Sequence, residues 1–196
     1  MAYVSDVQSI AGSSLHAFRI AVGEIWGEDV VRRGLDALDA DARLSVEQAA
    51  ALLWIPIEVH ERALAAWALA ARVEVEELLD RGVRRSTQRN MTTILRAFIR
   101  FTSDQAIVTR APLLYARIRN AGKLVVDYRG PGIARVQLSD WRNGNDQQMF
   151  SLSVSFEAML EVAGREHARC KFKRTSDGAI FDVTWDDPNV PPRRWR

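Results

Sequence analysis

A chain of 196 residues, 47% of them hydrophobic, can bury a sizeable core within one domain. Its 27 basic and 25 acidic residues leave a formal net charge of +2, which lacks the strong basic bias of nucleic-acid binders and so disfavours that class. The single cysteine, Cys170, excludes an internal disulfide, the N-terminus does not resemble a signal peptide, and no apolar run is long enough to span a bilayer. We therefore expect a cytoplasmic protein without a membrane span.

The N-terminal part has the pattern of helices. Apolar residues at helical spacing predict a helix over 13–38 that breaks or restarts at Gly27. Residues 39–43 are expected to form a turn. Ser45 then resembles the capped start of a new helix, with Gln48 at the reciprocal capping position.

Further helices follow along the chain. Pro56 is placed as the first-turn proline of an alanine-rich helix over 57–71. A helical stripe continues over 72–91, and Gly82 on that stripe predicts a close approach to a neighbouring helix. A last helix of this part is expected over 112–122, from a first-turn proline to a terminating glycine.

The hydrophobic period then changes from helical to alternating. Alternation predicts a β-hairpin over 123–138, turning at 129–132, and the polar stretch 139–148 is expected to be a loop. A second hairpin is predicted over 167–185, because Asp177-Gly178 is typical of a tight turn between strands.

The stretch between the hairpins fits two patterns. Phe150 to Phe156 alternates with serines as a strand would, but a longer window over 147–164 fits one helical face. We predict a helix there, because the longer window is satisfied and Gly164 ends it.

These elements predict an α+β fold in which a helical layer packs on a four-stranded antiparallel sheet formed by the two β-hairpins. We expect a single domain over 1–186, helical over 13–122, and a flexible basic tail over 187–196.

Short motifs spread over roughly residues 10–185 resemble a paralogous family of uncharacterised myxobacterial proteins. They are Gly12 with Leu15, Leu53-Trp54-Ile55-Pro56, Ala121-Gly122-Lys123, Phe156 with Gly164, and Phe181-Asp182-Val183-Thr184-Trp185. That family in turn resembles the superfamily of V4R (vinyl-reductase-type), haem-NO-binding and TRAPP-subunit proteins. The resemblance implies a helical layer on an antiparallel sheet, and small-molecule binding or assembly with partners in place of catalysis.

The haem-binding branch can be compared residue by residue. Its pattern has a proximal histidine on the helix before the first hairpin and Tyr-x-Ser-x-Arg in the hairpin region. Residues 91–122 contain no histidine, and Tyr128 is followed by Arg-Gly-Pro-Gly. The zinc-cysteine site of some relatives needs more than the one cysteine, Cys170. We therefore expect no cofactor.

No catalytic or metal site is expected either. The histidines His16, His60 and His167 are scattered over the chain, and no metalloprotease, nucleophile-elbow or phosphate-loop motif occurs. Cys170 lies on the apolar face of a predicted strand, where a cysteine is usually a small buried hydrophobe. The opposite face of that strand is interpreted as solvated, and its basic residues are Arg169, Lys171 and Lys173.

Aromatic residues are the candidates for a binding pocket or an interface. They are Trp26, Phe98, Phe101, Tyr115, Tyr128, Trp141 and Phe156. A pocket, if present, is expected between the helices and the sheet, lined by apolar groups from 91–126 and 149–163. Its ligand would be a small apolar molecule or a lipid.

The function that we favour from the sequence is a non-catalytic ligand-sensing or protein-interaction module. The alternative is a homodimeric scaffold that docks another protein through an exposed helix face. The helix over 57–71 is apolar on more than one face, which favours a homodimer. An enzyme has no supporting constellation of residues.

Overall fold

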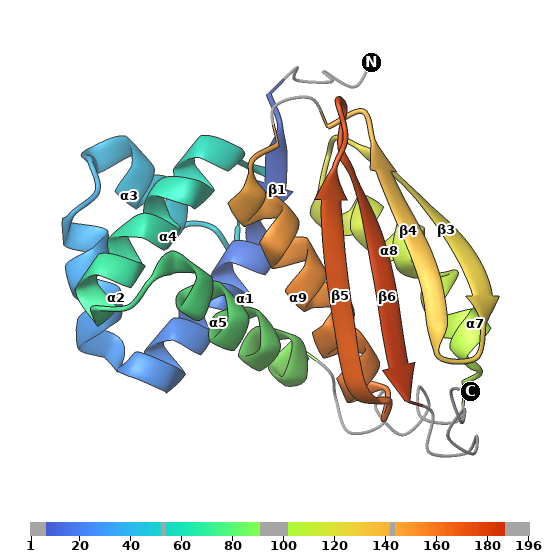
Figure 1. Cartoon of the computed structure of the whole chain (residues 1–196). Helices are drawn as coiled ribbons and strands as arrows, with labels where there is room; N and C mark the ends of the chain where they lie inside the picture. Colours follow the sequence, from blue (N-terminus) through green and yellow to red (C-terminus); the bar gives the residue numbers. More distant parts are fainter. Residues whose placement is uncertain (1–6, 52–53, 91–101, 142–143, 187–196) are drawn as a thin grey trace. The chain divides into compact units, whose positions relative to one another are not determined.

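The structure is a computed structural model, and it describes residues 7–51, 54–90, 102–141 and 144–186 (Figure 1). The chain divides into two compact units. Unit 1 is Met1–Ser86 with Ala116–Ala121, and unit 2 is Thr87–Tyr115 with Gly122–Arg196. The predicted tail over 187–196 lies outside the described residues, and a single domain over 1–186 stays a prediction.

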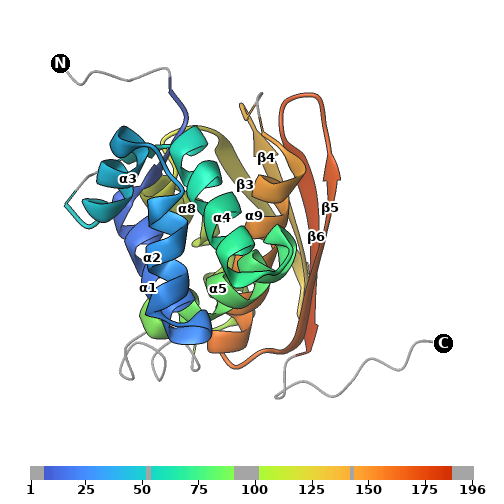
Figure 2. The same cartoon turned by 90° about the vertical axis from the view of Figure 1, so that its left-hand side faces the viewer.

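Unit 1 is built of helices, with α2 packed against both α1 and α4 (Figure 2). Its helices are α1 (Gly12–Trp26), α2 (Glu28–Asp36), α3 (Ala40–Glu47), α4 (Ile57–Ala71) and most of α5 (Val75–Asn90). The predicted break at Gly27 is confirmed. Its φ of 95° belongs to the region that glycine adopts without a steric penalty, so the chain can turn there between α1 and α2.

The predicted close approach at Gly82 is also confirmed. A Cβ at this position of α5 would lie 2.5 Å from the ring of Phe18 on α1, so only a glycine lets the two helices meet there. The ring of Phe18 lies 6.2 Å from that of Trp67, which is fully buried on α4. These rings bring α1, α4 and α5 together in the core of unit 1.

The start of α3 differs from the sequence prediction. Residues 39–43 are not a turn, because the Asp39 side chain accepts a hydrogen bond from the Ala42 N–H at 2.9 Å and so caps a helix that begins at Ala40. That hydrogen bond is also the largest cause of the lowered pKa of the Asp39 carboxyl. The predicted cap at Ser45 is wrong: its hydroxyl donates to the Asp41 carbonyl inside the helix, and Gln48 ends the helix.

A small two-stranded sheet in unit 1 was not predicted and interrupts the helical part. β1 (Ser9–Ala11) and β2 (Trp54–Pro56) pair antiparallel, so Pro56 ends a strand before α4 begins at Ile57. Asn120 joins this sheet: its Oδ1 accepts from the Ser9 N–H at 2.6 Å, and its Nδ2 donates to the Val7 carbonyl at 2.9 Å.

Unit 2 contains the predicted four-stranded antiparallel sheet, with strand order β3-β4-β6-β5. Its strands are β3 (Lys123–Gly130), β4 (Ile133–Ser139), β5 (Glu166–Arg174) and β6 (Ala179–Asp186). Both predicted hairpins are therefore confirmed, and β4 with β6 joins them into one sheet. One face carries alternating buried side chains, whereas Arg169, Lys171 and Lys173 on the other face are exposed, as interpreted from the sequence.

The helix predicted between the hairpins is confirmed as α9 (Asp146–Val162), which packs against β5 and β6 (Figure 1). Its first turn is capped by the Asn145 side chain, which accepts from the Gln148 N–H. Two short helices precede the sheet, α7 (Asp104–Val108) and α8 (Ala111–Ile118). α8 ends before Gly122, earlier than predicted, because the Asn120 and Arg119 backbones pair with β1 instead.

Candidate functional site

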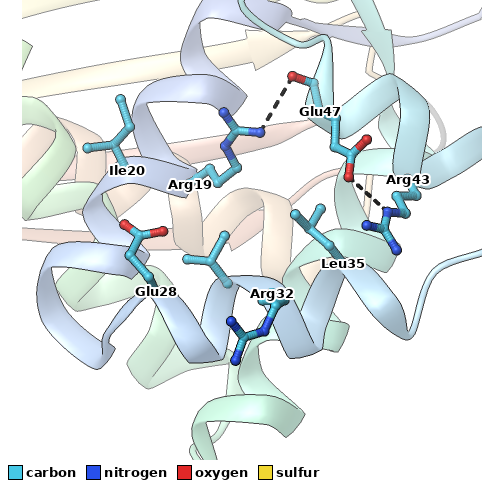
Figure 3. A pocket seen from close by; sticks show the side chains of 8 residues that line it. Arg19, Ile20, Glu28, Arg32, Leu35, Arg43 and Glu47 are labelled. Carbon is cyan, nitrogen blue, oxygen red and sulfur yellow. Dashed lines mark hydrogen bonds and ion pairs between the residues drawn. The ribbon is translucent and has the colours of Figure 1, made fainter.

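A pocket of about 460 Å³ lies on unit 1, between α1, α2 and α3 (Figure 3). This α1–α3 pocket is lined by the charged residues Arg19, Glu28, Arg32, Arg43 and Glu47 and by the apolar residues Ile20, Val31 and Leu35. Its volume falls in the range of roughly 300–1,000 Å³ that is usual for small-molecule sites. Charged and apolar groups thus face the same space.

Two of the three arginines are already paired with carboxylates. Arg43 Nε donates to Glu47 Oε1 at 2.8 Å and its Nη1 to Asp36 Oδ1 at 2.7 Å. The Glu47 hydrogen bond is the largest cause of the raised pKa of Arg43. Arg32 Nη2 lies 2.5 Å from Asp29 Oδ1, in a pair that is about 70% exposed on both sides. These pairs neutralise their own charges and leave little for a ligand.

Arg19 is bound differently. Its Nη1 lies 3.5 Å from both the Val46 and Glu47 carbonyl oxygens, at the limit of hydrogen-bonding distance, and its Nη2 lies 3.3 Å from His16 Nδ1. Among the described residues it has no carboxylate partner. A guanidinium has five N–H donors, so Arg19 keeps the capacity to bind an anion that enters the pocket.

Glu28 lies on the other side of the same pocket. It is the first residue of α2, and its carboxylate rests over Gly23 of α1, in the space that a Cβ would fill there. Within the described ranges Glu28 has no ion-pair partner. Figure 3 shows the Glu28 carboxylate on the side of Ile20 and the Arg19 guanidinium on the side of Glu47.

The pocket was not foreseen from the sequence. Arg19 and Glu28 lie on two different helices separated by the break at Gly27, and neither belongs to a spaced motif. The side chain of Val31 is 7% exposed and that of Leu35 9%, so the periodicity of α2 predicted their burial but not the open space beside them.

Five of the seven predicted aromatic residues are described, one in unit 1 and four in unit 2. In unit 1, Trp26 is half-buried at the end of α1, and the Arg81 guanidinium lies 4.7 Å from its ring centroid, which is a cation–π contact. In unit 2, Tyr115 and Trp141 are both buried, and both lie where a Cβ on Gly122 would be. Trp141 Nε1 also donates to Gln148 Oε1 at 2.6 Å.

Two more of these aromatic residues lie elsewhere in unit 2. Phe156 on α9 is half-buried and meets Phe181 of β6 edge to face, with ring centroids 5.4 Å apart. Tyr128 is half-buried on β3, opposite Ala134. Phe98 and Phe101 lie outside the described residues, as does part of the predicted lining over 91–126. The predicted pocket between helices and sheet therefore stays a prediction.

A buried ionic cluster holds one corner of unit 2 together. Asp104 Oδ1 accepts from Arg165 Nε at 2.6 Å, and Asp104 Oδ2 accepts from Trp185 Nε1 at 2.8 Å. Arg165 also donates to the Ala163 and Thr102 carbonyls, at 2.9 and 2.7 Å. Both charged side chains are only 4% exposed. Every part of this Asp104–Arg165–Trp185 cluster has partners inside the unit, which is typical of a structural ion pair.

Two other reactive side chains are placed in ways that oppose catalysis. His60 on α4 is buried, and its Nδ1 has no hydrogen-bond partner among the described residues. Burial, and then the charge of Arg119, lowers the pKa of the His60 imidazole to about 3, so the ring is neutral near pH 7. Burial also raises the pKa of the Cys170 thiol, as do the charges of Glu157 and Asp182, which disfavours the nucleophilic thiolate.

In the part of the chain that the structure describes, no three His, Cys, Asp or Glu side chains converge as metal ligands would. No helix there combines the length and the apolar character that crossing a bilayer requires.

The fold resembles solved structures of H-NOX domains, although no model of a known protein family and no curated protein matches the sequence. An oxygen-binding H-NOX domain related to soluble guanylate cyclases is 9% identical, with a TM-score of 0.64 over 94% of this chain and 100% of its own. The unliganded Fe(II) H-NOX protein from K. algicida is 8% identical, with a TM-score of 0.64 over 93% and 100%. A variant of the T. Tengcongensis H-NOX domain is 12% identical, with a TM-score of 0.64 over 92% and 100%. At these identities the likeness establishes the fold.

The residues do not fit haem held through a histidine and a Tyr-x-Ser-x-Arg motif. His16 lies beside Arg19, and His167 is exposed at the start of β5, where its Nδ1 lies 3.0 Å from Asp186 Oδ2. After Tyr128, Arg129 turns back to pair with Asp127 at 2.8 Å and leads into a glycine turn. The sequence over 91–101 has no histidine at all.

Proposed function

We propose that this chain is a non-catalytic ligand-sensing module that uses the H-NOX fold without the histidine-ligated haem. The observation that carries the proposal is the fold likeness, which extends over more than nine tenths of the chain. One of these neighbours is an oxygen-binding H-NOX domain related to soluble guanylate cyclases. A fold by itself does not determine chemistry, so the ligand is argued below from this chain's own residues.

Several observations support a role without catalysis. Neither His60, which is neutral inside unit 1, nor Cys170, which is a protonated thiol on β5 of unit 2, lines the α1–α3 pocket. One basic residue of the exposed sheet face is paired within the sheet, since Arg135 Nε donates to Asp182 Oδ1 at 2.7 Å. That pairing raises the pKa of Arg135 and limits the attraction of this face for nucleic acid.

The finer parts of the proposal rest on the sequence. Kinship with the myxobacterial family, and through it with the V4R and TRAPP-subunit proteins, depends on short motifs. A cytoplasmic location remains a prediction from the single cysteine. The homodimer and the scaffold that docks another protein also remain predictions, and the experiment below tests them.

Native mass spectrometry of the purified chain is the decisive experiment. We expect a bound mass that is lost on denaturation and that is not haem, together with no Soret band after incubation with haem. A stoichiometric complex with a Soret band would contradict the haem-free part of the proposal. A clean dimer with no bound mass would favour the scaffold and lead to a search for its protein partner.

A further inference from the structure

We propose that the α1–α3 pocket binds a small zwitterion with an apolar body, such as an aliphatic α-amino acid. Arg19 would take its carboxylate and Glu28 its ammonium group. This inference rests on the proposed function, because it names the class of ligand that the module senses.

The charges left over in the pocket lead to this class of ligand. Arg43 is shared by the carboxylates of Glu47 and Asp36, and Arg32 is held by Asp29. Arg19 and Glu28 then remain, one positive and one negative, each without an ion-pair partner in the described ranges. Arg19 is half-buried and Glu28 is exposed, so a ligand with a single charge would pair with one of them and leave the other to solvent, whereas a zwitterion would pair with both.

The two charged groups reach the pocket beside neighbouring turns of α1. The Glu28 carboxylate rests over Gly23, which lies four residues after Arg19 on α1, so the two attachment points are neighbouring turns of one helix. Neighbouring turns are about 5.4 Å apart. The charged groups themselves lie on different sides of the pocket, the Glu28 carboxylate beside Ile20 and the Arg19 guanidinium beside Glu47 (Figure 3). A zwitterion that pairs with both would therefore lie between them.

The rest of the lining determines the body of the ligand. Ile20, Val31 and Leu35 present aliphatic side chains to the same space, and no further unpaired charge faces it. An aliphatic side chain buried there would gain about 25 cal/mol for each Å² removed from water, whereas a polar one would lose hydrogen bonds.

Gly23 is the positioning residue of this arrangement. A Cβ there would overlap the Glu28 carboxylate, so an alanine would force the flexible tip of Glu28 to move. The backbone of α1 would not be harmed, because alanine is the better helix former. Gly23→Ala therefore moves the Glu28 carboxylate while keeping its charge, so it tests the position of that group alone.

Isothermal titration with three matched probes tests the inference. L-Leucine carries both charges, N-acetyl-L-leucine lacks the ammonium, and L-leucinamide lacks the carboxylate. We expect L-leucine to bind the wild-type chain at least about tenfold more tightly than either derivative, because each derivative leaves one pocket charge unpaired. Equal binding of L-leucine and N-acetyl-L-leucine would overturn the zwitterion in favour of a simple anion. Equal binding of L-leucinamide would overturn it in favour of a cation.

Substitutions locate the binding. Arg19→Gln and Glu28→Gln are each expected to weaken L-leucine about tenfold, and Gly23→Ala to weaken it less while the fold is kept. Arg81→Gln and Glu77→Gln on α5 are the matched controls, since this pair lies outside the pocket and should leave binding unchanged. Circular dichroism checks that each variant is folded.

Two results would contradict binding of this ligand class in the α1–α3 pocket without contradicting the proposed ligand-sensing function. If L-leucine, L-isoleucine and L-methionine all fail to bind at about 10 mM, the pocket does not take this class of ligand. If a mass co-purifies with the wild type and persists in Arg19→Gln and Glu28→Gln, the chain is a ligand binder through another site.

Discussion

In unit 2 the buried carboxylate of Asp104 accepts from Arg165 and Trp185, and the guanidinium fills its remaining contacts with backbone carbonyls. In unit 1 the buried imidazole of His60 leaves its Nδ1 without a partner among the described residues. Both side chains are only 5% exposed, so burial alone does not distinguish them. The difference lies in the hydrogen-bond and ion-pair partners. A buried side chain can keep its charge when such partners surround it, whereas a buried base without them is stable only in its neutral form.

The largest expected effect comes from breaking the complete cluster. Asp104→Ala should lower the free energy of unfolding by about 3–5 kcal/mol, because it leaves the Arg165 charge buried without a counter-ion. Urea denaturation followed by circular dichroism measures this. The control is Asp29→Ala, which removes the exposed partner of Arg32 and should cost less than about 1 kcal/mol. If both variants lose the same free energy of unfolding, the burial of the cluster does not add to its contribution to stability.

Acid should destabilise the folded chain through His60. Its pKa is about 3 in the folded chain and 6.5 in the unfolded one, so the unfolded chain binds the extra proton between these values. Stability contributed by the neutral ring is therefore present above about pH 6.5 and falls below it, by up to about 1.4 kcal/mol for each pH unit down to about pH 3.

His60→Leu tests this dependence. The variant cannot take up the proton, so its free energy of unfolding should fall less steeply than that of the wild type between about pH 6.5 and pH 4. The comparison is made by urea denaturation at a series of pH values, and parallel pH profiles for the two chains would refute the assignment. Near neutral pH we expect the two chains to differ little, since leucine also removes an unpaired polar atom.

A smaller effect is expected from trimming the cluster. Trp185→Phe keeps the ring against the core and removes only the N–H donated to Asp104 Oδ2, which should cost about 2 kcal/mol. The ion pair with Arg165 stays, so the loss should be well below that of Asp104→Ala. Denaturation of the single variants and of the double variant gives the coupling, and strictly additive losses would argue against a cooperative cluster.

Much of the fold follows from local patterns in the sequence. The alternation around Asp177-Gly178 predicted the second hairpin, and the longer helical window predicted α9 over the competing strand. The capping signal of α3 was ambiguous, and the prediction of Ser45 as its cap was wrong. Both Asp39 and Ser45 can cap a helix, and only the position of Ala42 against Asp39 decides between them.

The features that determine the candidate sites have no local signal. Asp104 and Arg165 are separated by 61 positions, and the three-residue strands β1 and β2 are too short to produce a period. Arg19 and Glu28 are ordinary charged residues on helix surfaces until the turn at Gly27 brings α2 back along α1. Such pairings depend on tertiary structure, so a single sequence could not reveal them.

Unit 1 is not continuous along the chain, and this affects the order in which it can be made. Residues 116–121 complete it: the Asn120 N–H donates to the Ser9 carbonyl, and Arg119 pairs with Ile10. During synthesis, Thr87–Tyr115 of unit 2 leave the ribosome before this closing segment does. The pairing of β1 with Arg119 and Asn120 must therefore wait for this segment, and a nascent chain stalled before residue 116 would leave one edge of that strand open to protease or to a chaperone.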